Sequence, residues 1–291
     1  MRVGLFPGQG VPALKVLNAL SADDPLVATA SEVVGFDVRR RVEIAARRKG
    51  ASLPTVVAQP AIFVAGVSSL HRARDGQPTF DFLAGHSLGE YTALVAGGAL
   101  DFEDALALVK ARAEAMETAA RSSPGAMAAV LGLDLAEVES IAGRAGAMVA
   151  NDNAPGQVVV SGTEDALART AALVRAAGAR SVLLEVAGPF HTGSMAPASS
   201  ALSDALDRVH VRMPSTPVVS NVTAKPYGSA EEIKELLIRQ PTERVRFRES
   251  LEWVWGRGAR EFHDLGPGTV VANLAQKTFR ALEKSEVSIH A

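Results

Sequence analysis

Residues 80–100 read FDFLAGHSLGEYTALVAGGAL, and this stretch decides the fold. The run Phe80–Gly85 has the short apolar character of a buried strand, and the residues from Leu88 onward have the apolar spacing and alanine content of a buried helix. Between them, residues 85–89 match G-x-S-x-G, the nucleophile elbow, whose small flanking residues permit a strained turn. The sequence therefore predicts a strand, a sharp turn and a helix, with Ser87 at the turn. A glycine-flanked serine in an ordinary turn is the alternative interpretation.

Beyond this stretch, short apolar runs alternate with longer helical patterns, which is typical of an α/β fold with a mainly parallel sheet. Asp101 precedes an amphipathic pattern and is expected to cap that helix. The other expected strands are residues 2–6, 217–222 and 261–266, and the expected helices are residues 102–120, 195–209 and 230–239.

The pattern changes between residues 125 and 189. Strands are expected at 126–133, 147–153, 156–162 and 181–187, and helices at 135–146 and 165–178. This β-α-β-β-α-β order is the ferredoxin-like arrangement. We therefore expect residues 125–189 to form a small subdomain inserted into a larger one made of residues 1–124 and 190–291, with a cleft between the two.

Composition excludes several classes of function. The chain has 291 residues, a formal net charge of -2 and no cysteine, and its pI is near 6.3. The charge gives no global reason to bind nucleic acid or an anionic membrane, and no apolar run is long enough to span a bilayer. The lack of cysteine rules out disulfides, thiolate catalysis and cysteine metal sites, and is compatible with a reducing cytoplasm.

A serine hydroxyl needs a base to become a good nucleophile at neutral pH. The chain offers His71, His86, His191, His210, His263 and His290. His191 is favoured because it lies in a Gly- and Pro-broken loop after an expected strand, where loops carry catalytic groups on a rigid scaffold. His263, in a short apolar strand, stays open as the base or as a core histidine.

Arg112 lies on or beside the apolar stripe of its helix and therefore needs a partner. It can extend to water or pair with a carboxylate such as Glu90. Alternatively it holds a substrate carboxylate, which a guanidinium fork binds with two hydrogen bonds.

Several motifs together resemble the malonyl-CoA:acyl carrier protein transacylases and the acyltransferase domains of polyketide synthases. The likeness runs nearly end to end. Its elements are FPGQG at 6–10, AQPA at 58–61, GHSLGEY at 85–91, VKARAEAM at 109–116, NAPGQVVVSG at 153–162, AGPFHTGSMAPA at 187–198, SNVTAKP at 220–226 and LGPG at 265–268.

The resemblance implies an α/β-hydrolase-like large subdomain and a ferredoxin-like small one. It makes Ser87 the nucleophile and His191 the base, oriented by a backbone carbonyl rather than by a third carboxylate. It also implies that the backbone N–H groups of Gln9 and Leu88 form the oxyanion hole. Arg112 would hold the free carboxylate of a malonyl group.

Other residues are implied to lie near the acyl pocket. These are Gln59, Asn151, Asn153 and Phe190, whose bulky ring next to His191 is similar to the Phe-His pair seen where the acyl group is malonyl. The departures are Val11-Pro12-Ala13, where the family continues with Ser-Gln and a longer loop, and Pro189, which stiffens the loop carrying His191.

The implied reaction transfers malonyl from coenzyme A to Ser87 and then to the phosphopantetheine thiol of an acyl carrier protein, without a metal or redox cofactor. A serine hydrolase, a non-catalytic carrier-binding subunit and an acyltransferase dedicated to another acyl-CoA are the rival functions. An acidic carrier would need a basic docking surface. Two clusters could supply it: Arg39–Arg41 with Arg47–Lys49, or Lys277 with Arg280 and Lys284.

Overall fold

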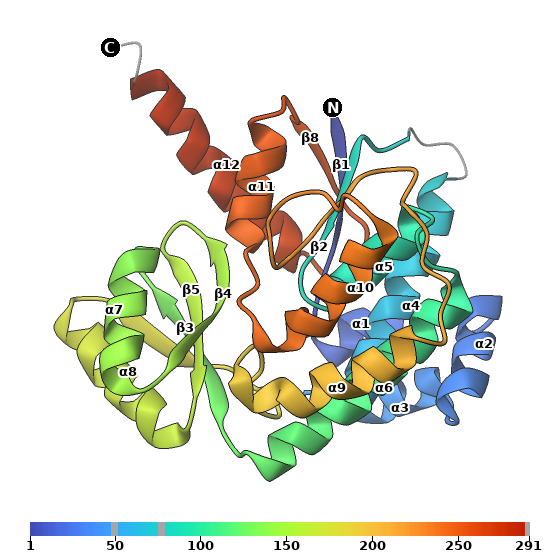
Figure 1. Cartoon of the computed structure of the whole chain (residues 1–291), viewed down its shortest axis with the longest axis horizontal. Coiled ribbons are helices and arrows are strands. Elements are labelled where there is room, and N and C mark those ends of the chain that lie inside the picture. The colour runs from blue at the N-terminus through green and yellow to red at the C-terminus, as the bar shows by residue number, and fades with distance from the viewer. Residues whose placement is uncertain (48–51, 75–78, 289–291) are drawn as a thin grey trace.

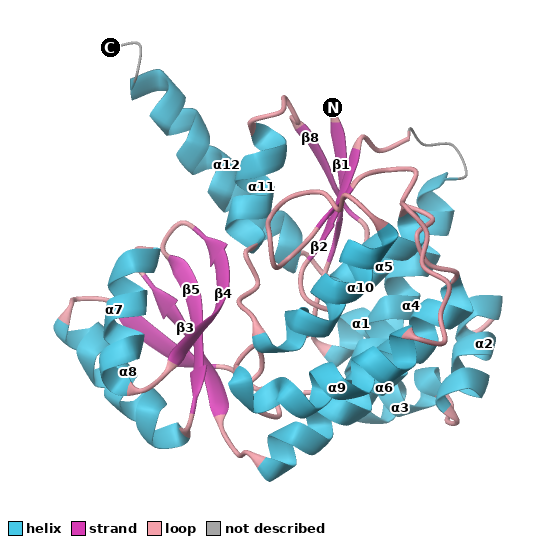
Figure 2. Ribbon diagram, in the orientation of Figure 1, coloured by secondary structure: helices cyan, strands magenta, loops and turns pink. Residues whose placement is uncertain are grey.

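The computed structural model describes residues 1–47, 52–74 and 79–288 and contains two separate sheets (Figure 1). Figure 2 shows strands β3, β4 and β5 on one side of the molecule, away from β1, β2 and β8. Of the sequence-derived features, Arg48, Lys49 and His290 lie outside the described residues.

The first sheet is parallel throughout and has the order β7-β2-β1-β8. Its strands are β1 (Arg2–Phe6), β2 (Phe82–Gly85), β7 (Val218–Val219) and β8 (Glu261–Asp264). β1 lies at the centre, and its residue Phe6 pairs with Gly85 at the end of β2. The carboxyl ends of β1 and β2 therefore meet where the segments FPGQG and GHSLG begin.

Helices cover both faces of this sheet, because side chains along each strand alternate between two apolar cores. Phe6 and Leu83 pack into the core formed with α4, α5 and α6, whereas Val3 and Leu5 pack against α11 and α12. The helices are α1 (Ala13–Ala19), α2 (Pro25–Val34), α3 (Val38–Ala46), α4 (Thr55–Arg74), α5 (Gly89–Ala96), α6 (Phe102–Ser122), α9 (Ala196–Leu206), α10 (Ala230–Arg239), α11 (Phe247–Trp255) and α12 (Val270–Ser288).

The second sheet is antiparallel and has the order β4-β5-β3-β6. Its elements follow one another as β3 (Ala126–Leu131), α7 (Leu135–Ala145), β4 (Met148–Ala154), β5 (Gln157–Gly162), α8 (Glu164–Ala176) and β6 (Arg180–Leu183). This is the ferredoxin-like order, so the expected fold class is confirmed. The boundaries at residues 124/125 and 189/190 stay predictions.

Several local expectations differ from the structure. The strand expected over residues 217–222 is formed by Val218–Val219 alone. The strand expected over residues 181–187 ends at Leu183, and the chain continues as a loop toward His191. Asp101 occupies the N-cap position of α6 but makes no capping hydrogen bond. Its carboxylate instead accepts from both terminal nitrogens of Arg212, at 2.5 and 3.3 Å. The guanidinium of Arg212 thus takes the carboxylate oxygens that the first N–H groups of α6 would otherwise use.

The two subdomains are joined by backbone pairing and by an ion pair. The N–H of Val245 donates to the oxygen of Ala150, and the N–H of Asp152 donates to the oxygen of Val245. The buried carboxylate of Asp152 also accepts from Arg248 of α11, with Nε 3.0 Å from both oxygens. None of the helices over the described residues has the length and apolar character needed to cross a membrane.

Candidate active site

Ser87 lies in the turn between β2 and α5 with a backbone φ of 52°. This left-handed conformation is uncommon for a residue with a side chain and is held by close backbone packing on both sides. A Cβ atom at Gly85 would lie 1.9 Å from the carbonyl carbon of Gly89, and one at Gly89 would lie 2.2 Å from the oxygen of Phe6. Both glycines of the G-x-S-x-G pattern are therefore sterically required.

His191 lies in the loop that follows β6, and its side chain contacts Ser87. Its Nε2 lies 2.9 Å from Oγ of Ser87. Its Nδ1 lies 3.0 Å from the backbone oxygen of Gln240 and 3.1 Å from that of Glu243. Because carbonyl oxygens only accept, Nδ1 carries the hydrogen and Nε2 presents its lone pair to the Ser87 hydroxyl.

Burial lowers the pKa of His191 to about 3, and the nearby positive charge of Arg112 adds to this effect. Both causes disfavour the imidazolium ion. The imidazole is therefore neutral, and able to accept a proton, throughout the physiological pH range.

The other histidine considered as a base is occupied elsewhere. Nε2 of His263 lies 2.9 Å from a carboxylate oxygen of Glu261, in the same strand. His86, next to the serine, turns toward the small subdomain, where its Nε2 lies 2.7 Å from Oδ1 of Asn153. Of the histidines in the described residues, His191 is the one within hydrogen-bond distance of the serine.

Arg112 projects from α6 into the same site and is 1% exposed. Its Nη2 donates to Oγ of Ser87 at 2.9 Å and to Oε1 of Gln240 at 2.9 Å. Its Nη1 donates to Oε1 of Gln59 at 2.8 Å. Within the described part of the chain no carboxylate forms an ion pair with Arg112, so the direct pairing with Glu90 considered from the sequence does not occur.

Gln59 links Arg112 to the loop after β1. Its Nε2 donates to Oε1 of Gln9 at 3.0 Å, and it is fully buried. The backbone N–H groups of Gln9 and Leu88 donate to no described residue. Leu88 is the N-cap residue of α5, where backbone donors lack helical partners. Both N–H groups are thus available to an external acceptor such as an oxyanion.

The remaining sequence candidates lie around this cluster. Phe190 is buried beside His191 and packs with Met116 and Met195. Asn151 and Asn153 lie on β4, both nearly buried, and Asn153 reaches the elbow through His86.

The sequence patterns gave no role to two residues that organise the site. Asn221 follows β7, and its Oδ1 accepts from the N–H of Ser87 at 2.6 Å. Gln240 follows α10, and its Nε2 donates to the oxygen of Ser87 at 3.0 Å. Asn221 at least falls within the SNVTAKP motif, whereas Gln240 stands in no motif that would have drawn attention to it.

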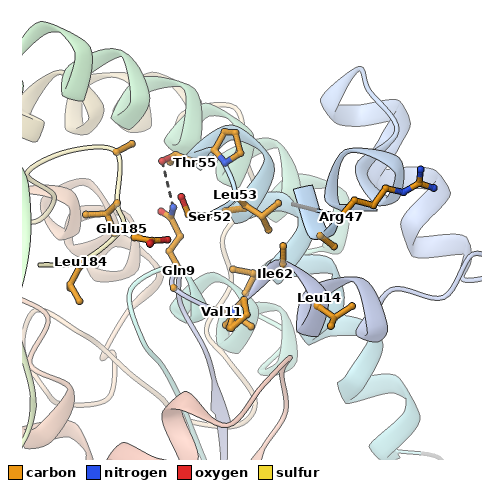
Figure 3. Close-up of a pocket in the computed structure, with 18 residues that line it drawn as sticks. Gln9, Val11, Leu14, Arg47, Ser52, Leu53, Thr55, Ile62, Leu184 and Glu185 are labelled. Atoms are coloured by element: carbon orange, nitrogen blue, oxygen red, sulfur yellow. Dashed lines mark hydrogen bonds between the residues drawn. The ribbon is translucent and has the colours of Figure 1, made fainter. Parts of the chain in front are cut away.

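A cavity of about 970 Å³ lies beside the site, and Gln9 is one of the residues that line it (Figure 3). Val11 and Pro12 of the shortened loop line it, as do Leu53 and Ile62 from the α4 side. Its other wall is formed by residues 184–187, the start of the loop that leads to His191. The departure from the family pattern at residues 11–13 therefore lies at the wall of a cavity beside the site. Within the described residues no group of three or more His, Asp or Glu side chains could hold a metal ion.

The profile of the acyl transferase domain family matches residues 13–290. The chain belongs to the acyl transferase domain family. Among curated relatives of this acyl transferase, the malonyl CoA-acyl carrier protein transacylase of Bacillus subtilis is 37% identical over 303 aligned positions, which cover 98% of this chain and 92% of the relative. The protein of the same name from Escherichia coli is 35% identical, with 98% and 94% covered.

Solved structures agree with this assignment. The malonyl CoA-acyl carrier protein transacylase of Coxiella burnetii superposes with a TM-score of 0.89 at 32% identity, covering 96% of this acyl transferase and 91% of that chain. A malonyl-transacylase solved in complex with its type II polyketide synthase acyl carrier protein gives a TM-score of 0.87 at 34% identity, with 95% and 92% covered.

Proposed function

We propose that this acyl transferase moves a malonyl group from malonyl-CoA to the phosphopantetheine thiol of an acyl carrier protein, through an ester on Ser87. The observation that carries the proposal is the buried guanidinium of Arg112, which lies 2.9 Å from the oxygen of a serine that is itself 2.9 Å from a neutral histidine. A cation at this position suits an acyl group that ends in a carboxylate. The names of the relatives support the same substrate.

In the first half-reaction, Nε2 of His191 takes the proton from Oγ of Ser87 as the oxygen attacks the thioester carbonyl. The tetrahedral intermediate then collapses, and the carbon–sulfur bond breaks. His191 returns the proton to the leaving sulfur, so coenzyme A departs as the thiol. The carbonyl oxygens of Gln240 and Glu243 hold the imidazole in the tautomer that this step needs.

The oxyanion of the intermediate would accept hydrogen bonds from the backbone N–H groups of Gln9 and Leu88. Preorganised donors of this kind act on charge that develops only in the transition state. In the second half-reaction His191 takes the proton from the carrier thiol, the thiolate attacks the ester, and the proton returns to Oγ of Ser87. This sequence balances without a metal or redox cofactor.

Selectivity for malonyl would rest on Arg112 and on the residues beside it. Binding the malonyl carboxylate requires Arg112 to exchange its hydrogen bond to Ser87 for bonds to the substrate, while Gln59 and Gln240 hold the rest of the guanidinium. Phe190 would disfavour a methyl branch at the α carbon, an effect of about 1–3 kcal/mol for one carbon atom. Asn153 would lie at the edge of the pocket, on the small subdomain.

We further propose that the protein acts in the cytoplasm, which suits a chain without cysteine.

For docking of the carrier protein, both basic clusters named from the sequence stay predictions. Arg40 and Arg47 share the carboxylate of Glu43, whereas Lys277 is exposed on α12 and contacts the backbone oxygen of Gly156.

The decisive experiment is intact-mass analysis after mixing with malonyl-CoA. We expect one malonyl adduct on the wild-type protein and none on Ser87→Ala, and we expect the adduct to be discharged by a carrier thiol but to persist in buffer. An adduct that survives in Ser87→Ala would contradict the assignment of the nucleophile. An adduct that water removes as fast as a thiol does would favour the serine hydrolase.

Competition among malonyl-, methylmalonyl- and acetyl-CoA tests the acyl specificity. The wild type should acquire malonyl, and Arg112→Ala should lose this preference because the carboxylate is left without its charged partner. A preference unchanged in Arg112→Ala would point to an acyltransferase for another acyl group.

A further inference from the structure

Glu90 lies three residues after the proposed nucleophile. Its backbone N–H donates to the oxygen of Ser87 at 3.1 Å, but its buried carboxylate hydrogen-bonds to neither Ser87 nor His191. It lies in the first turn of α5 and is 1% exposed. A buried charge is strongly unfavourable unless it is paired and hydrogen-bonded. Its position therefore calls for partners inside the protein.

Three donors surround this carboxylate. Oε1 accepts from the backbone N–H of Asn221 at 2.9 Å and from the hydroxyl of Tyr227 at 2.5 Å. Oε2 accepts from Nε2 of Gln240 at 2.5 Å. The two N–H groups can only donate, so the arrangement suits the ionised form. Burial raises the pKa of Glu90 above its ordinary value, and these hydrogen bonds and the charge of Arg112 offset that rise only in part.

The amide of Gln240 connects Glu90 to Arg112. At one end Nε2 donates to Glu90, and at the other Oε1 accepts from Nη2 of Arg112 at 2.9 Å. The orientation of this amide is fixed, because a guanidinium only donates and a carboxylate only accepts. One amide thus stands between a buried cation and a buried anion, and it is polarised by both.

We propose that Glu90 is a positioning residue and the internal counter-ion of Arg112, acting through the side-chain amide of Gln240 to hold the guanidinium toward the acyl group. This inference rests on the proposed function and names what sets the acyl specificity of that site. An indirect counter-ion leaves the hydrogen bond from Nη2 of Arg112 to Ser87 exchangeable for a bond to a substrate carboxylate, whereas a direct ion pair with Glu90 would occupy the guanidinium.

The test is Glu90→Gln, which keeps the shape of the side chain but removes its charge and one of its acceptor oxygens. The amide nitrogen of the new side chain would face one of the donors that now bind the carboxylate. If the amide of Gln240 rotated to accept from that nitrogen, its own N–H group would point at the N–H groups of Arg112. We expect the rate of Ser87 acylation by malonyl-CoA, relative to acetyl-CoA, to fall by about 10- to 100-fold.

Two further variants separate positioning from stability. Tyr227 donates to Glu90 but makes no hydrogen bond to Ser87, Gln240 or Arg112. Tyr227→Phe should therefore lower the melting temperature while keeping the malonyl preference. In an Arg112→Ala background, Glu90→Gln should leave the malonyl to acetyl ratio unchanged, because coupled residues are not additive. If Glu90→Gln does not fold, Gln240→Met cuts the same bridge and should give the same loss of preference.

The outcomes are distinguishable. A Glu90→Gln protein with the wild-type ratio, or with a loss equally large when Arg112 is absent, would overturn the role of Glu90. A Gln240→Met protein with the wild-type ratio of malonyl to acetyl acylation would also overturn the role of Glu90. Failure of the wild-type protein to form a malonyl adduct would instead overturn the proposed function.

Discussion

Ser87 and His191 both have left-handed backbone conformations, with φ of 52° and 59°. Neither residue is a glycine, so both conformations are strained and must be maintained by their surroundings. For Ser87 the surroundings include the side chains of Asn221 and Gln240, which bind its N–H and C=O. For His191 they include the two carbonyl oxygens that bind Nδ1. The proposed catalytic pair is thus held in place from both sides by the protein itself.

The pH dependence of acylation follows from the pKa of His191, which burial and Arg112 lower to about 3. Because kcat/KM reports the free enzyme, we expect kcat/KM for malonyl-CoA to show no loss attributable to this histidine as the pH falls from 8 to 5. The check is a pH–rate profile in buffers of constant ionic strength. A decrease of kcat/KM centred near pH 6.5, at pH values where the protein remains folded, would contradict the buried neutral base.

The same shift has a consequence for stability. Above the ordinary histidine pKa of 6.5, His191 is neutral in both the folded and the unfolded state and does not change the free energy of unfolding. As the pH falls below 6.5, only the unfolded chain takes up the proton, so the free energy of unfolding decreases until the folded pKa is approached near 3.

At the scale of elements, the sequence predicted the strands β1 to β8 and the helices α5 to α10 because their periodicities are local, but it assigned no helix to α1–α4, α11 or α12. The helix expected at 102–120 is α6 (Phe102–Ser122), and the one expected at 230–239 is α10 (Ala230–Arg239). The expected strand at 181–187 was too long, because its apolar residues continue into the loop. The cap at Asp101 was wrong, because Arg212, 111 residues away in the chain, binds that carboxylate.

The elbow provides a test at this scale. Gly85→Ala should lower the free energy of unfolding by about 3 kcal/mol or more, because the added Cβ would lie 1.9 Å from backbone that cannot move independently. Gly143→Ala, in α7, is the matched control. Its Cβ meets nothing within 4 Å, so this variant should be more stable by about 0.5–1 kcal/mol. Urea unfolding measures both, and equal effects would show that the elbow is not tightly packed.

At the scale of the whole molecule, the site depends on how the two subdomains are joined. Ser87 and Arg112 belong to the large subdomain, whereas Asn153 belongs to β4 of the small one and contacts the elbow through His86. The contact between β4 and Val245 and the ion pair of Asp152 with Arg248 hold β4 in this place. The contact of Asn153 with His86 is therefore supported by contacts that lie outside the cluster around Ser87.

Removing Arg248 tests this connection. Arg248→Met would leave the Asp152 carboxylate, 1% exposed, without its partner, and should lower the free energy of unfolding by about 3 kcal/mol. Arg121→Met breaks an exposed pair with Glu117 within one helix and should change it by less than about 1 kcal/mol. Chemical unfolding gives both values. A loss at Arg248 no larger than that at Arg121 would mean that backbone pairing alone joins the subdomains.

The sequence by itself determined the fold class, the elbow and the serine proposed as nucleophile, because these depend on local periodicity and on glycines within five residues. The resemblance named His191 and Arg112, but only the tertiary structure shows how they meet Ser87, and it adds Asn221 and Gln240 to the site. His191 lies 104 residues away in the chain, and Gln240 lies 128 residues from Arg112. The amide that separates Arg112 from Glu90 could not be read from spacing, since contacts at such separations are set by packing of the sheet, the helices and the loops between them. Local sequence fixes where a backbone turns, and the packing of distant segments fixes which side chains meet there.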